Sequence, residues 1–305
     1  MKVSIIGVGH LGNTLAYTLA MKQFATEISL VDPLNPDVAT GHALDLQQAL
    51  TLVGPIKIFP GSYETTADAD VVVITGGAKR KSDESRLDLI EKNTEITKQI
   101  IGNVLDYNQS CILIVANNPV DITTYTALKL SNFPRERVIG TGTLLDSLRF
   151  RFLLAEAANL NPETIESVII GEHGDSLVPI LSTTSVNGIN IFDASSLTDE
   201  NISKIVEKVK GMGSKLLTLK GGSTYTPALS IAYILDAIKN NNQILLPLSV
   251  YLQGEYGLDG LCMSVPVRLG HNGIEEIIEI KLTDEERRQL DISAGILKSE
   301  ISDLY

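Results

Sequence analysis

The sequence predicts an α/β fold in which a doubly wound parallel sheet is followed by a second, α+β part. Short runs of β-branched and aliphatic residues alternate with helical patterns in the first half, which is the order of βαβ units. These strand-like runs are apolar throughout, as in a sheet that helices cover on both faces. After about residue 142, the alternation gives way to longer helices and separate β-rich stretches.

The predicted strands of the first half are bounded by residues that end strands. Gly7 follows the first strand, and Asp32 and Pro33 follow the second. Two glycines, at 76 and 77, follow the next, and 117–119 (Asn-Asn-Pro) end the last. We expect strands over Val3–Ile6, Glu27–Val31, Val71–Thr75 and Cys111–Ala116, and helices over His10–Met21, Asp37–Leu50 and Leu87–Tyr107.

The second half reads differently, and we place a domain boundary near Gly142. The predicted domains are 1–142 and 143–305. Thr283 and Glu286 have the spacing of a capping box, which predicts the start of a last helix. Before it we expect helices over Leu145–Ala158, Glu200–Leu219 and Ser223–Lys239, and β-rich stretches over Ile165–Gly171 and Gln243–Ile280.

The composition limits the kinds of partner. The 305 residues carry a formal net charge of −12, and such a surface repels nucleic-acid phosphates and anionic lipid. We therefore expect no nucleic-acid and no membrane partner, and an anionic substrate needs a local basic pocket. The N-terminus has no signal-peptide pattern, so a cytoplasmic enzyme is the expectation. Cys111 and Cys262 sit in apolar runs and are expected to be buried free thiols, with no metal site.

A glycine motif predicts the cofactor site. Residues 7–12 (Gly-Val-Gly-His-Leu-Gly) form G-x-G-x-x-G between a predicted strand and a predicted helix, where the helix N-terminus faces the phosphates of a dinucleotide. This is the arrangement of a Rossmann-type domain. Asp32 ends the next strand and can accept both ribose hydroxyls, which favours NAD over NADP. Alone, Asp32 also fits a turn residue before Pro33. The expected cofactor-binding residues here are Gly7, Gly9, His10, Leu11, Gly12 and Asp32.

Three other residues predict acid–base chemistry on an anionic substrate. His173 stands between glycines after a β-rich run, although a lone histidine is often structural. Asp146 and Arg149 are three apart on a predicted helix and so share a face. The Asp can orient the imidazole and raise its pKa, while the Arg clamps a carboxylate through two hydrogen bonds.

The stretch 76–86 is a basic island on an acidic chain. It holds Lys79, Arg80, Lys81 and Arg86 and follows a strand at its carboxyl end, where doubly wound sheets bind ligands. An ordinary solvated loop is the alternative.

Taken together, these motifs resemble the lactate/malate dehydrogenase family over essentially the whole chain. Their order and spacing agree jointly with that family, although each is weak alone. The motifs are the glycines at 7–12 with Asp32, Gly76–Arg80, Glu84–Leu89, Asn118–Asp121, Gly140–Asp146, Arg149 and Gly171–Asp175.

The resemblance implies a role for each matching residue. His173 is the acid/base, and Asp146 holds it. Arg149 pairs with the substrate carboxylate, and Arg86 polarises the carbonyl. Asn118 helps to place the nicotinamide ribose and the reacting carbonyl, and Gly76 and Gly77 join the cofactor site. The family implies NAD, a small 2-oxo or 2-hydroxy acid as substrate, and a homodimer or homotetramer.

The resemblance leaves the substrate open, and we expect oxaloacetate and malate first. The family sets this choice six residues before the catalytic arginine, and here that residue is Arg80, which can pair with a second carboxylate. Small Ser223 fits the malate type as well. Glu84 and the run 86–89 favour the lactate branch, and the acids at 83 and 84 can neutralise Arg80. L-Lactate or another 2-hydroxy acid therefore remains open.

Two rival classes and one regulatory expectation complete the predictions. A non-catalytic NAD-binding protein needs none of His173, Asp146, Arg149 or Arg86, and a metal-dependent NAD glycosidase needs a metal site that the cysteines do not suggest. Relatives activated by fructose 1,6-bisphosphate bind it with an Arg and a His. Arg151 matches the Arg, but Glu166 replaces the His, so we expect no activation.

Overall fold

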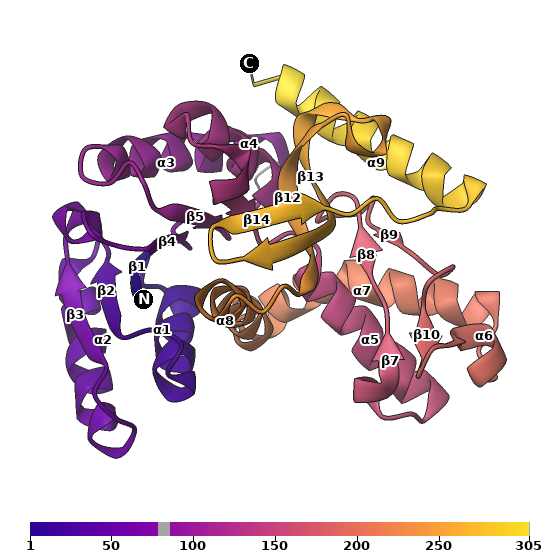
Figure 1. Ribbon diagram of the computed structural model, residues 1–305, viewed down its shortest axis with the longest axis horizontal. Helices are drawn as coiled ribbons and strands as arrows, with labels where there is room; N and C mark the ends of the chain where they lie inside the picture. Colours follow the sequence, from indigo (N-terminus) through magenta and orange to yellow (C-terminus); the bar gives the residue numbers. More distant parts are fainter. Residues whose placement is uncertain (79–85, 305) are drawn as a thin grey trace.

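One nine-stranded sheet runs through the molecule in the computed structural model, which describes residues 1–78 and 86–304 (Figure 1). Its strand order is β14-β13-β12-β6-β5-β4-β1-β2-β3. Strands β1 to β6 are parallel, and β12 to β14 continue the sheet antiparallel. The bounds are β1 Lys2–Ile6, β2 Glu27–Val31, β3 Lys57–Gly61, β4 Val71–Ile74, β5 Ile112–Val115, β6 Val138–Gly140, β12 Leu245–Gln253, β13 Asp259–Gly270 and β14 Gly273–Ile277.

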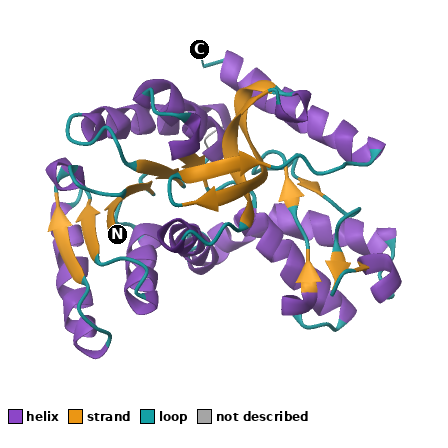
Figure 2. Cartoon of the chain, viewed as in Figure 1, coloured by secondary structure: helices purple, strands orange, loops and turns teal. Residues whose placement is uncertain are grey.

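Helices cover both faces of the parallel strands, as the apolar runs predict. Helices α3 and α4 lie on one side of the sheet, and α1 and α8 lie on the other (Figures 1 and 2). Alternate residues of β4 serve the two layers: Val71 and Val73 belong to one core, and Val72 and Ile74 to the other. The helices are α1 His10–Lys22, α2 Pro36–Ala49, α3 Arg86–Leu105, α4 Val120–Ser131, α5 Leu144–Ala158, α6 Ile191–Ala194, α7 Asp199–Lys220, α8 Tyr225–Asn240 and α9 Asp284–Ser302.

The structure confirms the predicted α/β class and adds three elements in the first half that the sequence patterns did not reveal. Strand β3 lies at the sheet edge, contains Pro60 and is only partly buried, so it has no apolar run. Strand β6 is three residues long. Helix α4 is rich in buried threonines, which are weak helix formers, and it is held by tertiary packing.

The second half has a hydrophobic core of its own but shares the large sheet. Phe150 of α5 and Val209 of α7 belong to a separate apolar cluster. Strand β12 nevertheless pairs with β6 through Ser249 and Gly140, so the sheet crosses residue 142. The division into 1–142 and 143–305 stays a prediction. Short strands complete this half: β7 Ile165–Glu166, β8 Ile169–Ile170, β9 Val178–Pro179, β10 Ser185–Val186 and β11 Ile189–Asn190.

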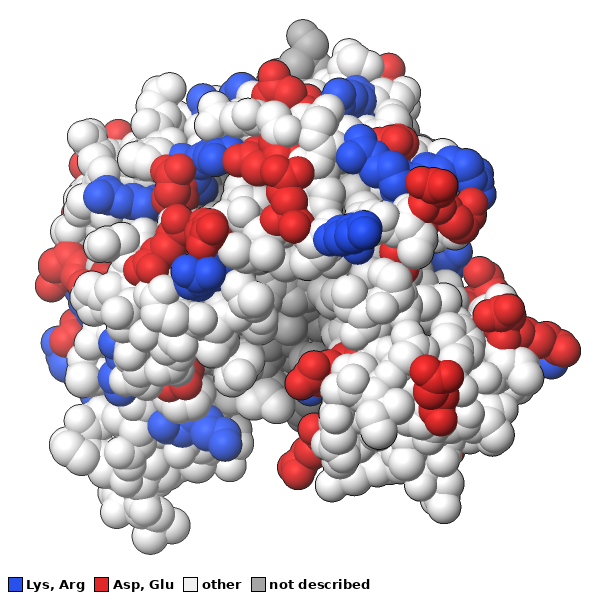
Figure 3. Space-filling view, turned by 45° about the vertical axis from the view of Figure 1, so that its right-hand side comes forward, with Lys and Arg blue, Asp and Glu red and all other residues white. Residues whose placement is uncertain are grey.

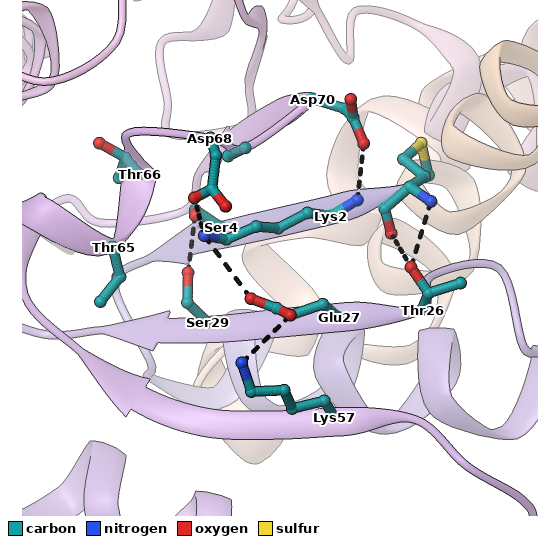
Figure 4. Close-up of polar contacts among 12 residues, drawn as sticks. Lys2, Ser4, Thr26, Glu27, Ser29, Lys57, Thr65, Thr66, Asp68 and Asp70 are labelled. Atoms are coloured by element: carbon teal, nitrogen blue, oxygen red, sulfur yellow. Dashed lines mark hydrogen bonds and ion pairs between the residues drawn. The ribbon is translucent and has the colours of Figure 1, made fainter.

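Ion pairs close the amino ends of the first strands, at the edge opposite to the glycine turn. The Lys2 side chain contacts Asp68 and lies 3.6 Å from Glu27, which also pairs with Lys57 at 3.2 Å (Figure 4). The backbone amide of Lys2 donates to Asp70. Because these charges pair with one another, we interpret them as stabilising this edge of the sheet.

Candidate active site

The turn between β1 and α1 has no room for a side chain at two of its three glycines. Gly7 has φ +94°, and a Cβ there would lie 2.4 Å from the backbone nitrogen of Gly76. A Cβ on Gly12 would lie 2.1 Å from the carbonyl oxygen of Gly7. Both clashes are with backbone, so these glycines let β1, α1 and the loop after β4 pack together.

The middle glycine differs, because a Cβ on Gly9 meets nothing within 4 Å. Gly9 is also the N-cap of α1 and offers no side chain to the first helical amides. The open backbone and the positive end of the helix dipole form a cradle for an anionic phosphate. The residues therefore fit the dinucleotide that the sequence predicts.

Asp32 lies at the carboxyl end of β2, beside this turn. One carboxylate oxygen accepts the backbone N–H of Val8 at 2.9 Å, and the other accepts that of Asn35 at 3.0 Å. The turn contact that we offered as the alternative thus exists. It does not compete with a ribose role, because each carboxylate oxygen can accept more than one hydrogen bond.

A buried asparagine that we did not predict joins the two cofactor loops. The Asn93 amide in α3 donates to the carbonyl oxygens of Ala78, at 3.0 Å, and Asn118, at 2.7 Å, and it accepts from the N–H of Ala78 at 2.7 Å. Gly77 fits against it, since a Cβ there would lie 3.3 Å from the Asn93 side chain. Asn93 therefore brings Gly77 and Asn118 together. No local pattern marks a buried amide on a long polar helix.

The structure brings together two predicted catalytic residues, His173 and Asp146, and the predicted carboxylate-binding residue Arg149. One oxygen of Asp146 lies 2.5 Å from Nδ1 of His173, and the other accepts from Nη1 of Arg149 at 3.2 Å. Asp146 and Arg149 lie one turn apart on α5, as predicted. Their side chains are nearly buried, with 4% and 12% exposed, while His173 keeps 17%. The imidazole thus retains a path to a substrate.

Burial and charge oppose each other at these side chains. Burial alone lowers the pKa of His173, but the Asp146 carboxylate outweighs it, and the pKa ends above its ordinary value. Burial also lowers the pKa of Arg149, against the opposing charge of Asp146. An arginine stays cationic at neutral pH even so. The site therefore sets a proton donor beside a fixed positive charge.

The loop of His173 is held by three neighbouring elements. The Gly171 amide donates to Ser264 of β13 at 2.9 Å, and the Glu172 amide donates to the Ser293 hydroxyl of α9 at 2.8 Å. The His173 amide donates to a carboxylate oxygen of Asp121 at 2.8 Å. Asp121 is buried in the first turn of α4, and we had quoted it only as part of the family motif.

Other predicted residues are not joined to this cluster. Ser223 is partly buried in the segment between α7 and α8, and no hydrogen bond links it to the described side chains of Asp146, Arg149 or His173. Arg80 lies outside the described residues. Arg86 begins α3, and its side chain is outside the description. Both cysteines are buried and free, as predicted, and burial raises the pKa of Cys111 to about 12.

Comparisons with known proteins agree with this geometry. The family model for the lactate/malate dehydrogenase NAD-binding domain matches residues 1–140, and the model for the α/β C-terminal domain of the same family matches 143–305. The chain belongs to the lactate/malate dehydrogenase family. This identifies an NAD-dependent dehydrogenase and removes both rival classes.

Relatives in the family carry lactate rather than malate names. The chain is 42% identical to L-lactate dehydrogenase of Acetivibrio thermocellus, with 99% of this chain and 97% of the relative covered. It is 39% identical to L-lactate dehydrogenase of Lacticaseibacillus casei, with 100% and 94% covered. The crystal structure of a minor L-lactate dehydrogenase from Enterococcus mundtii superposes with a TM-score of 0.96 at 36% identity, covering 100% of this chain and 98% of the other.

The expectation of oxaloacetate and malate is therefore wrong. It depended on the charge of Arg80, and full-length relatives with lactate names overturn it. A guanidinium that pairs with carboxylates of its own chain has fewer donors left for a second carboxylate of a substrate. Asp83 and Glu84 stand three and four positions after Arg80 in the sequence. The charge of Arg80 alone therefore does not predict a dicarboxylic substrate.

Proposed function

We propose that this chain is an NAD-dependent L-lactate dehydrogenase that interconverts pyruvate and L-lactate. The observation that carries the proposal is on α5, where the two oxygens of Asp146 divide between the imidazole of His173 and the guanidinium of Arg149. A proton donor thus stands beside a carboxylate-binding cation, which suits a 2-oxo acid. The lactate names of the relatives support pyruvate as that acid.

His173 moves the proton. Its Nδ1 is tied to Asp146, so Nε2 is the nitrogen that faces the reaction. In pyruvate reduction, Nε2 gives its proton to the carbonyl oxygen and the ring becomes neutral. In lactate oxidation, the neutral ring takes the hydroxyl proton, and Asp146 stabilises the charge that results.

Arg149 binds the carboxylate of the acid. One of its five N–H donors lies on Asp146, which leaves others for a two-point contact. We assign Arg86 to the developing charge on the carbonyl, Asn118 to the nicotinamide ribose and carbonyl, and Ser223 to the pocket, on the family resemblance alone.

The nucleotide is held by the glycine turn. Gly7, Gly9, His10, Leu11 and Gly12 carry the phosphates at the start of α1, Asp32 accepts the ribose hydroxyls, and Gly76 and Gly77 border the same crevice. NAD supplies the hydride chemistry when bound. The protein supplies orientation and the proton.

The decisive test measures initial rates with NADH and a series of 2-oxo acids at matched concentrations. We expect pyruvate to give the highest kcat/KM. Because Asp146 raises the pKa of His173 against the effect of burial, pyruvate reduction should decline as pH rises through that pKa, while lactate oxidation should rise over the same range. A higher kcat/KM for a longer or a dicarboxylic 2-oxo acid would contradict the proposal.

Arg149→Lys tests the carboxylate contact separately. Lysine keeps the charge but loses the planar pair of donors. We expect the KM for pyruvate to rise by about tenfold or more while the affinity for NADH stays near that of the wild type. An unchanged KM would remove Arg149 from the substrate site.

We also propose that the enzyme is a homo-oligomer and works in the cytoplasm. Large apolar side chains stay exposed on helices that contact α8: Tyr17 of α1, Phe152 of α5, and Leu229 and Tyr233 of α8 itself. The face drawn in Figure 3 is hollowed near its centre, and acidic and basic side chains as well as uncharged ones border the hollow. Exposed apolar side chains on neighbouring helices are typical of subunit contacts. Two free cysteines suit a reducing compartment.

Sedimentation velocity tests the assembly. We expect the wild type to sediment as a dimer or tetramer and Tyr233→Lys, which buries a charge in the contact, to shift the population toward monomer. A monomeric wild type would contradict the proposal.

A further inference from the structure

A buried carboxylate outside the pair of His173 and Asp146 joins three distant parts of the chain. One oxygen of Asp121, in the first turn of α4, accepts the backbone N–H of His173 at 2.8 Å. The other oxygen accepts the hydroxyl of Ser249, in β12, at 2.6 Å. Asp121 is 2% exposed, and no described lysine or arginine forms an ion pair with it. Its charge is therefore stabilised by these two donors.

The position of Asp121 links the cofactor loop to the acid/base. Asp121 follows Asn118 by three residues, and the Asn118 carbonyl is itself held by the Asn93 amide at 2.7 Å. The Asn118 loop is thus fixed on one side by α3 and on the other, through Asp121, to the backbone of His173. Hydride and proton transfer need the two loops at a fixed distance and orientation, since a misplacement of about 1 Å can lower the rate about 100-fold.

We propose that Asp121 is a positioning residue that holds the backbone of His173 against the Asn118 loop and adds a second negative charge behind the imidazole. The proposal rests on the proposed role of His173 as acid/base. Asp121 touches no substrate in this scheme and acts through His173. Its amide contact sits on His173 itself, whereas Ser264 and Ser293 hold the two residues before it.

The electrostatic part follows from the charges around the ring. Asp146 contacts the imidazole, Asp121 faces the backbone of the same residue, and Arg149 opposes both. Around Asp121 stand Glu172 and Cys262, with Lys129 also acting on the thiol. Burial raises the pKa of Asp121 to about 6, against the Ser249 and His173 hydrogen bonds. Asp121 is mostly ionised at neutral pH, and it favours the protonated imidazole.

A purely structural role is the alternative. An aspartate in the first turn of a helix stabilises it through the helix dipole, and that role acts on the stability of α4 without changing the pKa of His173. The two roles are separable because asparagine can keep both hydrogen bonds. Its amide oxygen can accept from the His173 N–H, and its amide nitrogen can donate to the Ser249 oxygen.

The experiment compares Asp121→Asn, Asp121→Ala and the control Thr124→Val in the full-length enzyme. Thr124 is buried on the same helix, bonds only the Val120 carbonyl and has no hydrogen bond to His173. The readouts are the pKa of His173 from imidazole NMR titration, assigned with His173→Asn, together with NADH affinity and with kcat and KM for whichever 2-oxo acid is turned over.

We expect Asp121→Asn to lower the pKa of His173 by about half a unit to one unit while kcat at low pH stays within about threefold of the wild type. Asp121→Ala should lower the same pKa, and it should reduce kcat about tenfold or more because the His173 loop loses the hydrogen bond to Asp121. NADH affinity should stay nearly unchanged. Thr124→Val should change neither quantity.

An unchanged His173 pKa in Asp121→Asn overturns the electrostatic part, and a wild-type kcat in folded Asp121→Ala overturns the positioning part. If Asp121→Ala does not fold, the His173 pKa of Asp121→Asn still decides the electrostatic part. The NMR titration needs no substrate. A wild type that fails to reduce pyruvate would therefore contradict the proposed function while leaving this inference to be decided by the titration.

Discussion

The nucleotide end of this molecule depends on backbone shape, whereas the chemistry end depends on charged side chains. At the nucleotide end the decisive atoms belong to the backbone: Gly7 and Gly12 are needed because any Cβ would strike a neighbouring main chain, and Gly9 leaves its surroundings open. At the chemistry end the decisive atoms are charged side chains almost removed from water, namely Asp146, Arg149 and Asp121.

This difference determines how substitutions at each end affect stability and activity. A backbone cradle depends on shape, so adding one methyl group can disrupt the fold around it. A buried charge cluster depends on mutual compensation, so removing one charged partner leaves the other uncompensated, whereas a neutral side chain of similar volume changes the charge with little change in shape. Substitutions at the two ends can therefore separate the effects of shape from those of charge.

The largest effect is expected from removing the proton donor. His173→Asn leaves a similar volume but no titratable group, so kcat should fall on the order of 10³-fold or more. NADH binding, measured by fluorescence titration, should stay close to that of the wild type because the glycine turn is untouched. Substantial turnover by this variant would show that another residue carries the proton.

A single methyl group should be nearly as damaging at the nucleotide end, but only at the crowded glycine. Gly12→Ala places a Cβ 2.1 Å from the Gly7 carbonyl oxygen, and we expect a loss of more than about 2 kcal/mol in unfolding free energy. Gly9→Ala is the matched control and should keep the melting temperature while weakening NADH binding. Equal destabilisation by both variants would refute the distinction between packing and open glycines.

Cofactor choice tests Asp32, a charged side chain at the nucleotide end. Asp32 repels a 2′-phosphate, so the wild type should strongly prefer NADH to NADPH in kcat/KM. Asp32→Ser should narrow that preference by about tenfold or more. Asn35→Ala is a control, since it removes the side-chain amide that donates to Asp32 at 3.5 Å but keeps the carboxylate charge and the backbone N–H that Asp32 accepts at 3.0 Å. Equal use of both cofactors by the wild type would contradict the ribose role.

The buried charge at Asp121 should have a stability cost that depends on pH. Burial raises the pKa of Asp121 to about 6, above the ordinary value of an aspartate, so folding favours the protonated form. The cost is absent below about pH 4, grows between the two pKa values and is complete above pH 6, on the order of 1–3 kcal/mol. The melting temperature of Asp121→Asn relative to the wild type should therefore rise as pH goes from 4 to 7.5. A gap that is constant with pH would show that Asp121 is not titrating in the fold.

The smallest expected effect is none. Glu166 is exposed on β7 and puts a carboxylate where the family resemblance leads us to expect the histidine of a bisphosphate site. Arg151 is partly buried, and its Nε has no hydrogen-bond partner among the described residues. Millimolar fructose 1,6-bisphosphate should change neither the KM for pyruvate nor the melting temperature. A several-fold fall in KM would show that other cations have taken over the site.

The sequence by itself determined the parts of the molecule in which the informative residues are neighbours along the chain. Gly7, Gly9 and Gly12 lie within six residues between a strand and a helix, so local geometry alone predicts the cradle. Asp146 and Arg149 lie one helical turn apart, and their shared face followed from the period of the helix. The apolar strands likewise predicted a sheet buried on both faces.

Only the tertiary structure decided which distant polar groups meet. Asn93 and Asp121 look like ordinary helix residues in the sequence, because a buried hydrogen bond leaves no periodic pattern. Asp121 meets His173 across 52 positions and Ser249 across 128. Strand β12 similarly joins β6 through one pair, Ser249 and Gly140, and so carries one sheet through both halves. The free energy of such contacts depends on which groups are removed from water together, and only the assembled fold fixes that.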